Sequence, residues 1–308
     1  MVDRHTSPSS RGWLSPRVVG RRQFIALLGG AAVVAAVLWL SITHAQQNDQ
    51  LRAVQTRILR LRAEAAADRI NQFIREVESQ VGWTTQLPWS ADNIDQRRFD
   101  GLRLLRQVPA ITELAQLDSA GIEQLKVSRL AMDVVGNGTD YSQDPKFTVA
   151  VAKKVYYGPV FLRRQSAPYM TLSLAGTRRD AGVSIAMVSL KLVWDVIKGM
   201  KVGAHGIAYI VDTEGRVIAH SELESYGRDA QGRVTVQLDL NLFQQDFSGL
   251  AQVQAARSAS AGGAARSGAQ VVQDTHGRDV LSDYAAIGPL GWLVFVEVPV
   301  EEAHALAQ

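Results

Sequence analysis

The apolar residues of this sequence form one unbroken run near its start and periodic patterns after it. Residues 24–42 read FIALLGGAAVVAAVLWLSI and contain no charged side chain. A helix needs roughly 20 apolar residues to cross the hydrocarbon core of a bilayer, and a helix that is apolar on every side belongs in lipid or in a large core. The pattern predicts a transmembrane anchor over residues 24–44.

Arginines before the run predict its orientation. Residues 1–23 hold five arginines and one acidic residue, Asp3. The positive-inside rule places such a tail in the cytoplasm. We therefore expect a cytoplasmic basic tail over residues 1–23, an anchor in the cell inner membrane, and the bulk of the chain in the periplasm.

Two other interpretations of the apolar run remain open. Residues 21–25 (RRQFI) resemble a twin-arginine export signal, and residues 43–45 (THA) resemble a cleavage site. Cleavage would release the rest of the chain, whereas an uncleaved run would anchor it, and both place that part outside the cytoplasm. The third interpretation is a buried core helix, which two glycines and the length of the run disfavour.

A helical pattern, with apolar residues three or four positions apart, predicts one long stalk helix over residues 45–86. Its first half follows the alternating steps of a coiled-coil seam, which would pair two copies in a homodimer, whereas its second half carries larger side chains suited to packing on a domain. An ordinary amphipathic helix without a dimer seam is the alternative. The two apolar sets are Leu51, Val54, Ile58, Leu61 and Ala65, and Ile70, Phe73, Val77 and Val81.

Short helical and strand-like segments alternate over the remainder of the chain. Residues 169–175 and 182–190 alternate polar and apolar side chains on either side of a short turn, which is typical of a β-hairpin. Residues 207–211 and 216–220 repeat this arrangement around a turn that contains Gly215. The mixture of helices and hairpins predicts an α+β fold with antiparallel sheets, not a doubly wound parallel sheet.

The positive charge of the chain is concentrated in its N-terminal tail. The full sequence has 33 basic and 30 acidic residues, and removal of the five arginines and Asp3 of the tail leaves 28 basic and 29 acidic residues. A body without net positive charge lacks the electrostatic footprint of phosphate-backbone binding, so we expect no nucleic-acid partner. The absence of cysteine excludes disulfides, thiolate metal sites and cysteine nucleophiles.

The common catalytic and metal-binding motifs are absent from the sequence. There is no HExxH, GxSxG or phosphate loop ending in GK[ST], and no GxGxxG follows a predicted strand. The six histidines are too far apart in sequence to form a helical metal pair. We therefore expect no catalytic residue, no metal site and no cofactor, and an enzyme is the least favoured class of function.

Cationic and phenolic side chains gather between residues 153 and 171. A helix over residues 147–157, followed by the hairpin, would bring them onto one concave face able to bind a small molecule with an acidic group and an apolar body. The alternative is that the cations are solvated and the tyrosines belong to an ordinary core. The residues are Lys153, Lys154, Tyr156, Tyr157, Arg163, Arg164, Tyr169 and Thr171.

Motifs in the second half of the chain resemble a known receptor module. They are Lys201-Val202-Gly203, the run from Gly206 to Asp212, GRVIAH at residues 215–220, and the closing segment from Gly288 to Pro299. Together with Asp144-Pro145-Lys146 and Tyr156-Tyr157, they resemble the double Cache sensor over roughly residues 48–304. This is the PAS-like extracytoplasmic domain of bacterial transmembrane receptors of the histidine kinase or cyclase type.

The resemblance implies an α+β fold with an N-terminal transmembrane helix, a long stalk helix and two PAS-like Cache subdomains, each with an antiparallel sheet flanked by helices. The membrane-distal subdomain would span residues 87–200 and the membrane-proximal one residues 201–304. Such a module senses a small-molecule ligand in its distal subdomain. It passes the signal through the stalk helix to an output domain, such as a histidine kinase or cyclase, that is not in this chain. The alternative is an exported solute-binding protein, released at the twin-arginine-like signal.

The resemblance also implies where the ligand binds. Family members that bind amino acids tend to have arginine, then Trp-Tyr, and a later aspartate, where this sequence has Lys154, Tyr156-Tyr157 and Val188-Ser189. The departure leaves the ligand class open. The distal pocket of the family maps onto Lys154, Tyr156, Tyr157, Tyr169 and Thr171.

Overall fold

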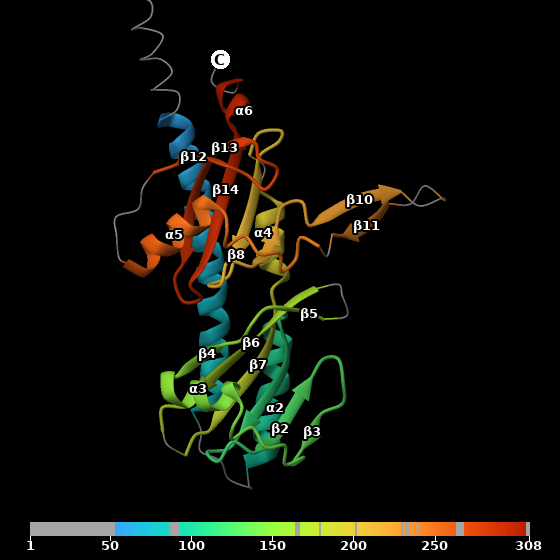
Figure 1. Ribbon diagram of the computed structural model, residues 1–308. Helices are drawn as coiled ribbons and strands as arrows, with labels where there is room; N and C mark the ends of the chain where they lie inside the picture. Colours follow the sequence, from blue (N-terminus) through green and yellow to red (C-terminus); the bar gives the residue numbers. More distant parts are fainter. Residues whose placement is uncertain are drawn as a thin grey trace, which may run out of the picture. The chain divides into compact units, whose positions relative to one another are not determined.

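Figure 1 shows the computed structural model of the chain. The predicted basic tail over residues 1–23 and the predicted anchor over residues 24–44 lie outside the residues that it describes. Among the helices of the described part, none has both the length and the apolar character needed to cross a bilayer. The described residues are 53–86, 93–163, 167–178, 180–200, 202–228, 231, 234–239, 241–262 and 268–305.

A long N-terminal helix covers residues 53–82 and continues into the 3-10 helix η1 (Trp83–Thr85). The second half of the helix buries Ile70, Ile74 and Val77, each of which is at most 1% exposed. These side chains pack because they recur three or four positions apart and therefore share one face of the helix. Of the predicted stalk helix, the described part is thus helical from residue 53 to Thr85.

The first half of the same helix exposes part of its apolar surface. Val54 is 56% exposed, Ile58 37% and Leu61 55%. These residues belong to the set whose spacing follows a coiled-coil seam, whereas the buried Ile70 and Val77 belong to the other set. Ile74, which is also buried, was in neither set. The division of the apolar positions into two sets therefore corresponds to a difference in burial.

Seven antiparallel strands form the first sheet, in the order β3-β2-β1-β7-β6-β4, with β5 paired to β6. The hairpin predicted for residues 169–190 is present as β6 and β7. Helix α2 contacts β1 and β2, and α3 contacts β4 and β6. The elements are α2 (Ile94–Gln107), β1 (Ile111–Leu117), β2 (Glu123–Ser128), β3 (Val134–Val135), α3 (Pro145–Lys153), β4 (Val155–Tyr157), β5 (Phe161–Arg163), β6 (Ala167–Ala175) and β7 (Val183–Ser189).

Five antiparallel strands form the second sheet, in the order β12-β13-β14-β8-β9, and β10 pairs with β11 in a separate ribbon. Helix α4 follows the first sheet in sequence and contacts β8 and β9 of the second. The fold is therefore α+β, with antiparallel sheets flanked by helices, as predicted. The elements are α4 (Lys191–Lys198), β8 (Ile207–Val211), β9 (Val217–His220), β10 (Glu224–Arg228), β11 (Val234–Leu238), α5 (Ala251–Gly262), β12 (Gln270–Gln273), β13 (Asp279–Ile287), β14 (Trp292–Pro299) and α6 (Val300–Ala305).

Each sheet has an inner face that packs on the N-terminal helix and an outer face that points away from it. On β6, Met170 and Leu172 belong to the same buried cluster as the helix, whereas Thr171 between them points to the opposite side. On β14, Val294 belongs to that cluster, while Phe295 lies in a separate one. One helix therefore shares a continuous hydrophobic core with both sheets.

Three hairpin turns use the same Asp-x-x-Gly motif. In the turn between β8 and β9, Asp212 Oδ1 accepts hydrogen bonds from the backbone N–H groups of Glu214 and Arg216, two and four positions later, at 2.9 Å each. The turns that begin at Asp118 and Asp274 repeat both hydrogen bonds. The fourth residue is always glycine with positive φ, +93° at Gly215, a conformation that costs other residues roughly 1–2 kcal/mol. Both sheets thus contain the same locally encoded turn.

Candidate ligand-binding site

The outer face of the first sheet carries hydroxyl groups in positions that are nearly closed to solvent. Thr171 and Ser173 on β6 are 5% and 0% exposed. Met187 and Ile185 of β7 lie beside them across the sheet, and Tyr156 of β4 pairs with Ser173 on the other side. Hydroxyl groups, an aromatic ring and apolar side chains therefore alternate across this face.

Helix α3 covers part of the outer face and is fixed at both ends by its sequence. Asp144 Oδ1 accepts the backbone N–H of Lys146 at 2.8 Å, and Pro145 suits the first turn of a helix. Lys154 ends the helix in a left-handed conformation, with φ +73°. The apolar cluster on this side of the sheet contains Ala115, Leu117, Ala150, Val183 and Ile185, with Tyr141, Phe147, Tyr156 and Ala175 packed against it.

The Ser173 hydroxyl is buried and has no hydrogen-bond partner within the part of the chain that the structure describes. A buried hydroxyl left unpaired costs roughly 1–3 kcal/mol. Thr171, two residues away on the same strand, lies near Tyr156. Both side chains adjoin Gly158, since a Cβ added to this glycine would lie 3.2 Å from Thr171 Cβ and 3.5 Å from Tyr156 Cε1. Ser173, Thr171 and Tyr156 therefore form one contiguous set of polar groups.

A charged cluster occupies the same face. Glu113 on β1 accepts a hydrogen bond from Arg163 Nη2 at 2.7 Å and forms an ion pair with Lys126 Nζ at 3.4 Å. The Arg163 guanidinium carbon lies 5.9 Å from the centre of the Tyr169 ring, which is within cation–π distance. Only 14% of the Glu113 side chain is exposed, so two cations compensate a carboxylate that is largely removed from water.

A second carboxylate lies near the edge of the face. Glu123 is 2% exposed and accepts a hydrogen bond from Asn137 Nδ2 at 2.7 Å. Burial, with a further contribution from Glu123, raises the pKa of Tyr141 and keeps its phenol neutral. Lys146 Nζ lies 5.7 Å from the centre of the Tyr141 ring. The outer face therefore offers both carboxylates and cations beside aromatic rings.

The structure brings together three of the five residues that the sequence assigned to the site. Tyr156, Tyr169 and Thr171 all point to the outer face, since each pairs in register with another outer-face position. Sequence reasoning missed Ser173 and Glu113. The polar–apolar alternation of β6 could have identified Ser173, because it lies two residues after Thr171 on the same side of the strand. No local pattern marks Glu113.

The other two residues lie elsewhere. Tyr157 points to the inner face, where its hydroxyl donates a hydrogen bond to the Glu78 carboxylate of the N-terminal helix. Lys154 is exposed at the end of α3 and lines a hollow of about 170 Å³ with Phe147 and Arg178. Adjacent residues of a strand point to opposite faces, so Tyr156 and Tyr157 cannot contact the same ligand on one face.

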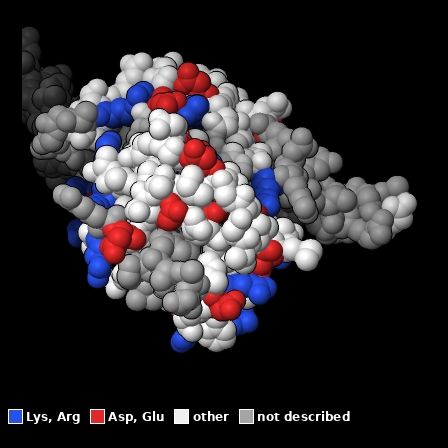
Figure 2. All heavy atoms as spheres, turned by 90° about the horizontal axis from the view of Figure 1, so that it is seen from below, with Lys and Arg blue, Asp and Glu red and all other residues white. Residues whose placement is uncertain are grey.

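Charged side chains on one face of the molecule do not gather by sign. On the face shown in Figure 2, the lysines and arginines of the described residues are interspersed with aspartates and glutamates among a larger uncharged area. In the described part of the chain, no three His, Asp or Glu side chains converge in a way that would hold a metal ion.

The sequence profile of the Cache domain family matches residues 43–307. The chain belongs to the Cache domain family. The two sheets of this Cache chain and its long N-terminal helix are the parts of the structure that this match covers. No curated protein matches the sequence.

Solved structures with the same fold include a chemoreceptor sensory domain and extracellular domains of proposed histidine kinases. The sensory domain of the Campylobacter jejuni chemoreceptor Tlp3 has a TM-score of 0.63 at 9% identity, and the similarity covers 84% of this chain and 99% of that domain. The same domain with isoleucine bound has a TM-score of 0.61 at 10% identity, covering 83% and 97%. The extracellular domain of mmHK1S-Z2, a proposed histidine kinase, has a TM-score of 0.58 at 13% identity, covering 79% and 97%.

At these identities the comparisons establish the fold of this Cache chain and not its ligand. Two of these structures are the sensory domain of one chemoreceptor, once with isoleucine bound, and the third is the extracellular domain of a proposed histidine kinase. The predicted membership of the Cache family is confirmed, while the residues of the site stay a prediction.

Proposed function

We propose that this chain is the extracytoplasmic small-molecule sensing module of a transmembrane signal-transduction receptor. The ligand binds on the outer face of the first sheet, in the membrane-distal subdomain of residues 87–200, and residues 201–304 form the membrane-proximal subdomain. The observation that carries this proposal is the buried, unpartnered hydroxyl of Ser173 beside Thr171 and Tyr156. A ligand that donates or accepts a hydrogen bond there would satisfy a group that folding leaves unpaired.

The charges of the outer face indicate what kind of ligand would fit. Two cations, Arg163 and Lys126, pair with the single carboxylate of Glu113, so the cluster has one positive charge in excess. A ligand with an acidic group could pair with one cation while the other keeps Glu113 paired, whereas a purely basic ligand would add to the excess. The rings of Tyr156 and Tyr169 provide apolar surface beside these groups.

The signal passes from the outer face to the N-terminal helix. Strand β4 presents Tyr156 to the ligand and Tyr157 to Glu78 of the helix. A shift of this short strand on ligand binding therefore acts directly on a hydrogen bond to the helix. Two arrangements of strand and helix, with different affinities for the ligand, are sufficient for signalling.

The receptor is a homodimer through the first half of the N-terminal helix. The exposed apolar residues Val54, Ile58 and Leu61 supply the face that a second copy would cover. Residues 24–44 anchor the chain in the inner membrane with residues 1–23 in the cytoplasm. The bulk then lies in the periplasm.

A thermal-shift screen of the full chain against amino acids, organic acids and amines tests the proposal, because a ligand that binds only the folded state raises the melting temperature. Ser173→Ala should remove a ligand-induced shift, and Thr171→Val should reduce it. Thr213→Val changes an exposed threonine in a turn of the second sheet and should leave the shift intact. A ligand whose shift is equal in all three variants would place binding elsewhere.

A further inference from the structure

A groove follows the N-terminal helix on the side where α4 lies beside it. Its larger hollow has a volume of about 610 Å³, within the roughly 300–1,000 Å³ of small-molecule sites. A second hollow of about 430 Å³ shares Arg69, Asp195 and Val196 with the first. The helix residues of the two linings extend from Arg62 to Val77, which is roughly 22 Å along a helix axis.

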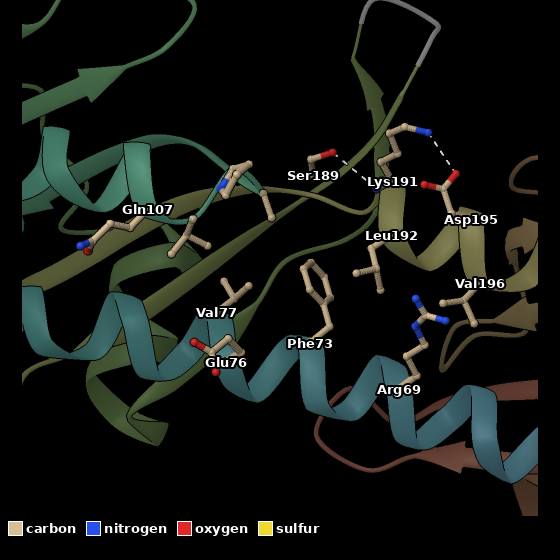
Figure 3. Close-up of a pocket in the computed structure, with 13 residues that line it drawn as sticks. Arg69, Phe73, Glu76, Val77, Gln107, Ser189, Lys191, Leu192, Asp195 and Val196 are labelled. Atoms are coloured by element: carbon tan, nitrogen blue, oxygen red, sulfur yellow. Dashed lines mark hydrogen bonds and ion pairs between the residues drawn. The ribbon is translucent and has the colours of Figure 1, made fainter.

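The larger hollow has apolar walls from three parts of the fold. Phe73 and Val77 come from the N-terminal helix, Val108 from the connection between α2 and β1, and Leu192 and Val196 from α4. Figure 3 shows Phe73 and Leu192 pointing toward each other across the hollow. A hydrocarbon body that entered it would replace water on all three walls.

One cation in this groove has no counter-ion. Arg69 is exposed, lines both hollows, and forms neither an ion pair nor a hydrogen bond with any residue that the structure describes. The neighbouring charges are engaged, since Lys191 Nζ lies 3.0 Å from Asp195 Oδ1, and Glu76 Oε1 accepts a hydrogen bond from Gln80 at 3.0 Å. In Figure 3 the guanidinium of Arg69 extends from the helix toward Val196. Because Gln80 is neutral, Glu76 keeps its negative charge, but it lies seven residues further along the helix, roughly 10 Å from Arg69 along the axis. At the Arg69 end of the hollow the charge left to be matched is therefore positive.

We propose that this groove is a second binding site and that it takes an amphipathic carboxylate. The acidic group pairs with Arg69, whose planar guanidinium suits a carboxylate. The hydrocarbon body fills the hollow between Phe73 and Leu192. Because the walls belong to the helix, to the end of α2 and to α4, the bound molecule bridges the elements that connect the first sheet to the second. It therefore stabilises one relative position of helix and α4 independently of the ligand on the outer face.

Isothermal titration calorimetry of the full chain in lipid nanodiscs, with octanoate as the probe and empty nanodiscs as the baseline, tests this site. We expect saturable binding of octanoate and none of octylamine, which carries the opposite charge on the same chain. Arg69→Gln should weaken binding about tenfold through loss of a charge-assisted hydrogen bond. Leu192→Glu should abolish binding, since it places a carboxylate in the hollow.

Arg75→Gln is the matched control, because Arg75 is exposed on the same helix and lines neither hollow. The proposal is overturned if octanoate gives no saturable heat, or if its affinity is the same in Arg69→Gln and Arg75→Gln. Self-association of the chain that Leu192→Glu prevents, without octanoate binding, would also overturn it and assign the groove to a second copy. Thr171→Val should bind octanoate normally, so failure of this site and failure of the outer-face site are distinguishable.

Discussion

Tyr157→Phe removes one oxygen atom and with it the hydrogen bond between β4 and the N-terminal helix. A hydrogen bond to a charged group contributes roughly 1.5–3 kcal/mol. Both Tyr157 and Glu78 are partly exposed, so water can replace the lost partner and the effect belongs at the low end. We expect a loss of about 1.5 kcal/mol in the free energy of unfolding, or roughly 3–6 °C in melting temperature for a chain of this size.

The sign of the pH dependence follows from the same contact. Burial first, and then the hydrogen bond to Glu78, raise the pKa of Tyr157. A group whose pKa is higher in the folded state than in the unfolded state stabilises the fold below the unfolded value, which is about 10 for tyrosine. The contribution is therefore complete at neutral pH and declines as the pH rises above about 10. Tyr157→Phe should remove this decline.

A double-mutant cycle followed by circular dichroism during thermal unfolding measures the contact. Glu78→Gln alone should cost about as much as Tyr157→Phe, and the double variant should cost little more than either, because both remove the same bond. Ligand affinity should change as well, by up to about tenfold for a contact of this size, because the hydrogen bond favours one of the two arrangements of strand and helix that differ in ligand affinity. Fully additive losses in the double variant would refute the reasoning.

Three further outcomes are expected. Burial lowers the pKa of His220 to about 4, so the unfolded chain takes up a proton at a higher pH than the folded chain does. The free energy of unfolding should therefore fall by up to about 3 kcal/mol as the pH drops from 6.5 to 4. If denaturant unfolding of His220→Asn shows the same fall over this pH range, the prediction is contradicted. Gly215→Ala should lower the free energy of unfolding by over about 2 kcal/mol, and Gly277→Ala by only about 1 kcal/mol. The difference arises because an added Cβ meets Ser248 Cα at 2.9 Å in the first turn and nothing within 4 Å in the second. Equal losses in urea unfolding would count against the packing argument. Since the chain has no other cysteine, Ile58→Cys should form a disulfide-linked dimer on oxidation, and a monomer on a non-reducing gel would exclude the helix seam.

Short periodic patterns predicted much of this fold. The alternation over residues 169–175 identified β6 and its pairing with β7, because each side chain of a strand on a half-buried sheet must suit its face. The spacing of apolar residues in the N-terminal helix placed Ile58 and Ile70 in different sets, and the structure gives them different burial, with Ile58 37% exposed and Ile70 0% exposed. Local sequence determines such features because a neighbour on the same face lies only two to four residues away.

The candidate site was harder to predict. The sequence favoured a helix over residues 147–157, which would have placed Tyr156 and Tyr157 on adjoining positions of one helix. Instead Lys154 adopts a left-handed conformation, the helix ends at Lys153, and a three-residue strand separates the two rings to opposite faces. The propensities of single residues carry no signal for such a break at a lysine.

Contacts between distant strands could not be predicted at all. Arg163 and Glu113 are fifty residues apart in sequence and meet only because β6 and β7 bring β5 toward β1. Neither residue has a sequence neighbour of opposite charge that would indicate the pair. The strand order of the sheet, and not any motif, creates the charged part of the site.

The core that the N-terminal helix shares with both sheets has a consequence for cooperativity. Neither sheet can lose its inner face without exposing the same helix, so the two should unfold in a single calorimetric transition. A ligand bound only on the first sheet must then slow amide hydrogen exchange in the second, at Val294 and its neighbours as well as at Met170. The helix would thus transmit stability between the halves even where no atom changes place.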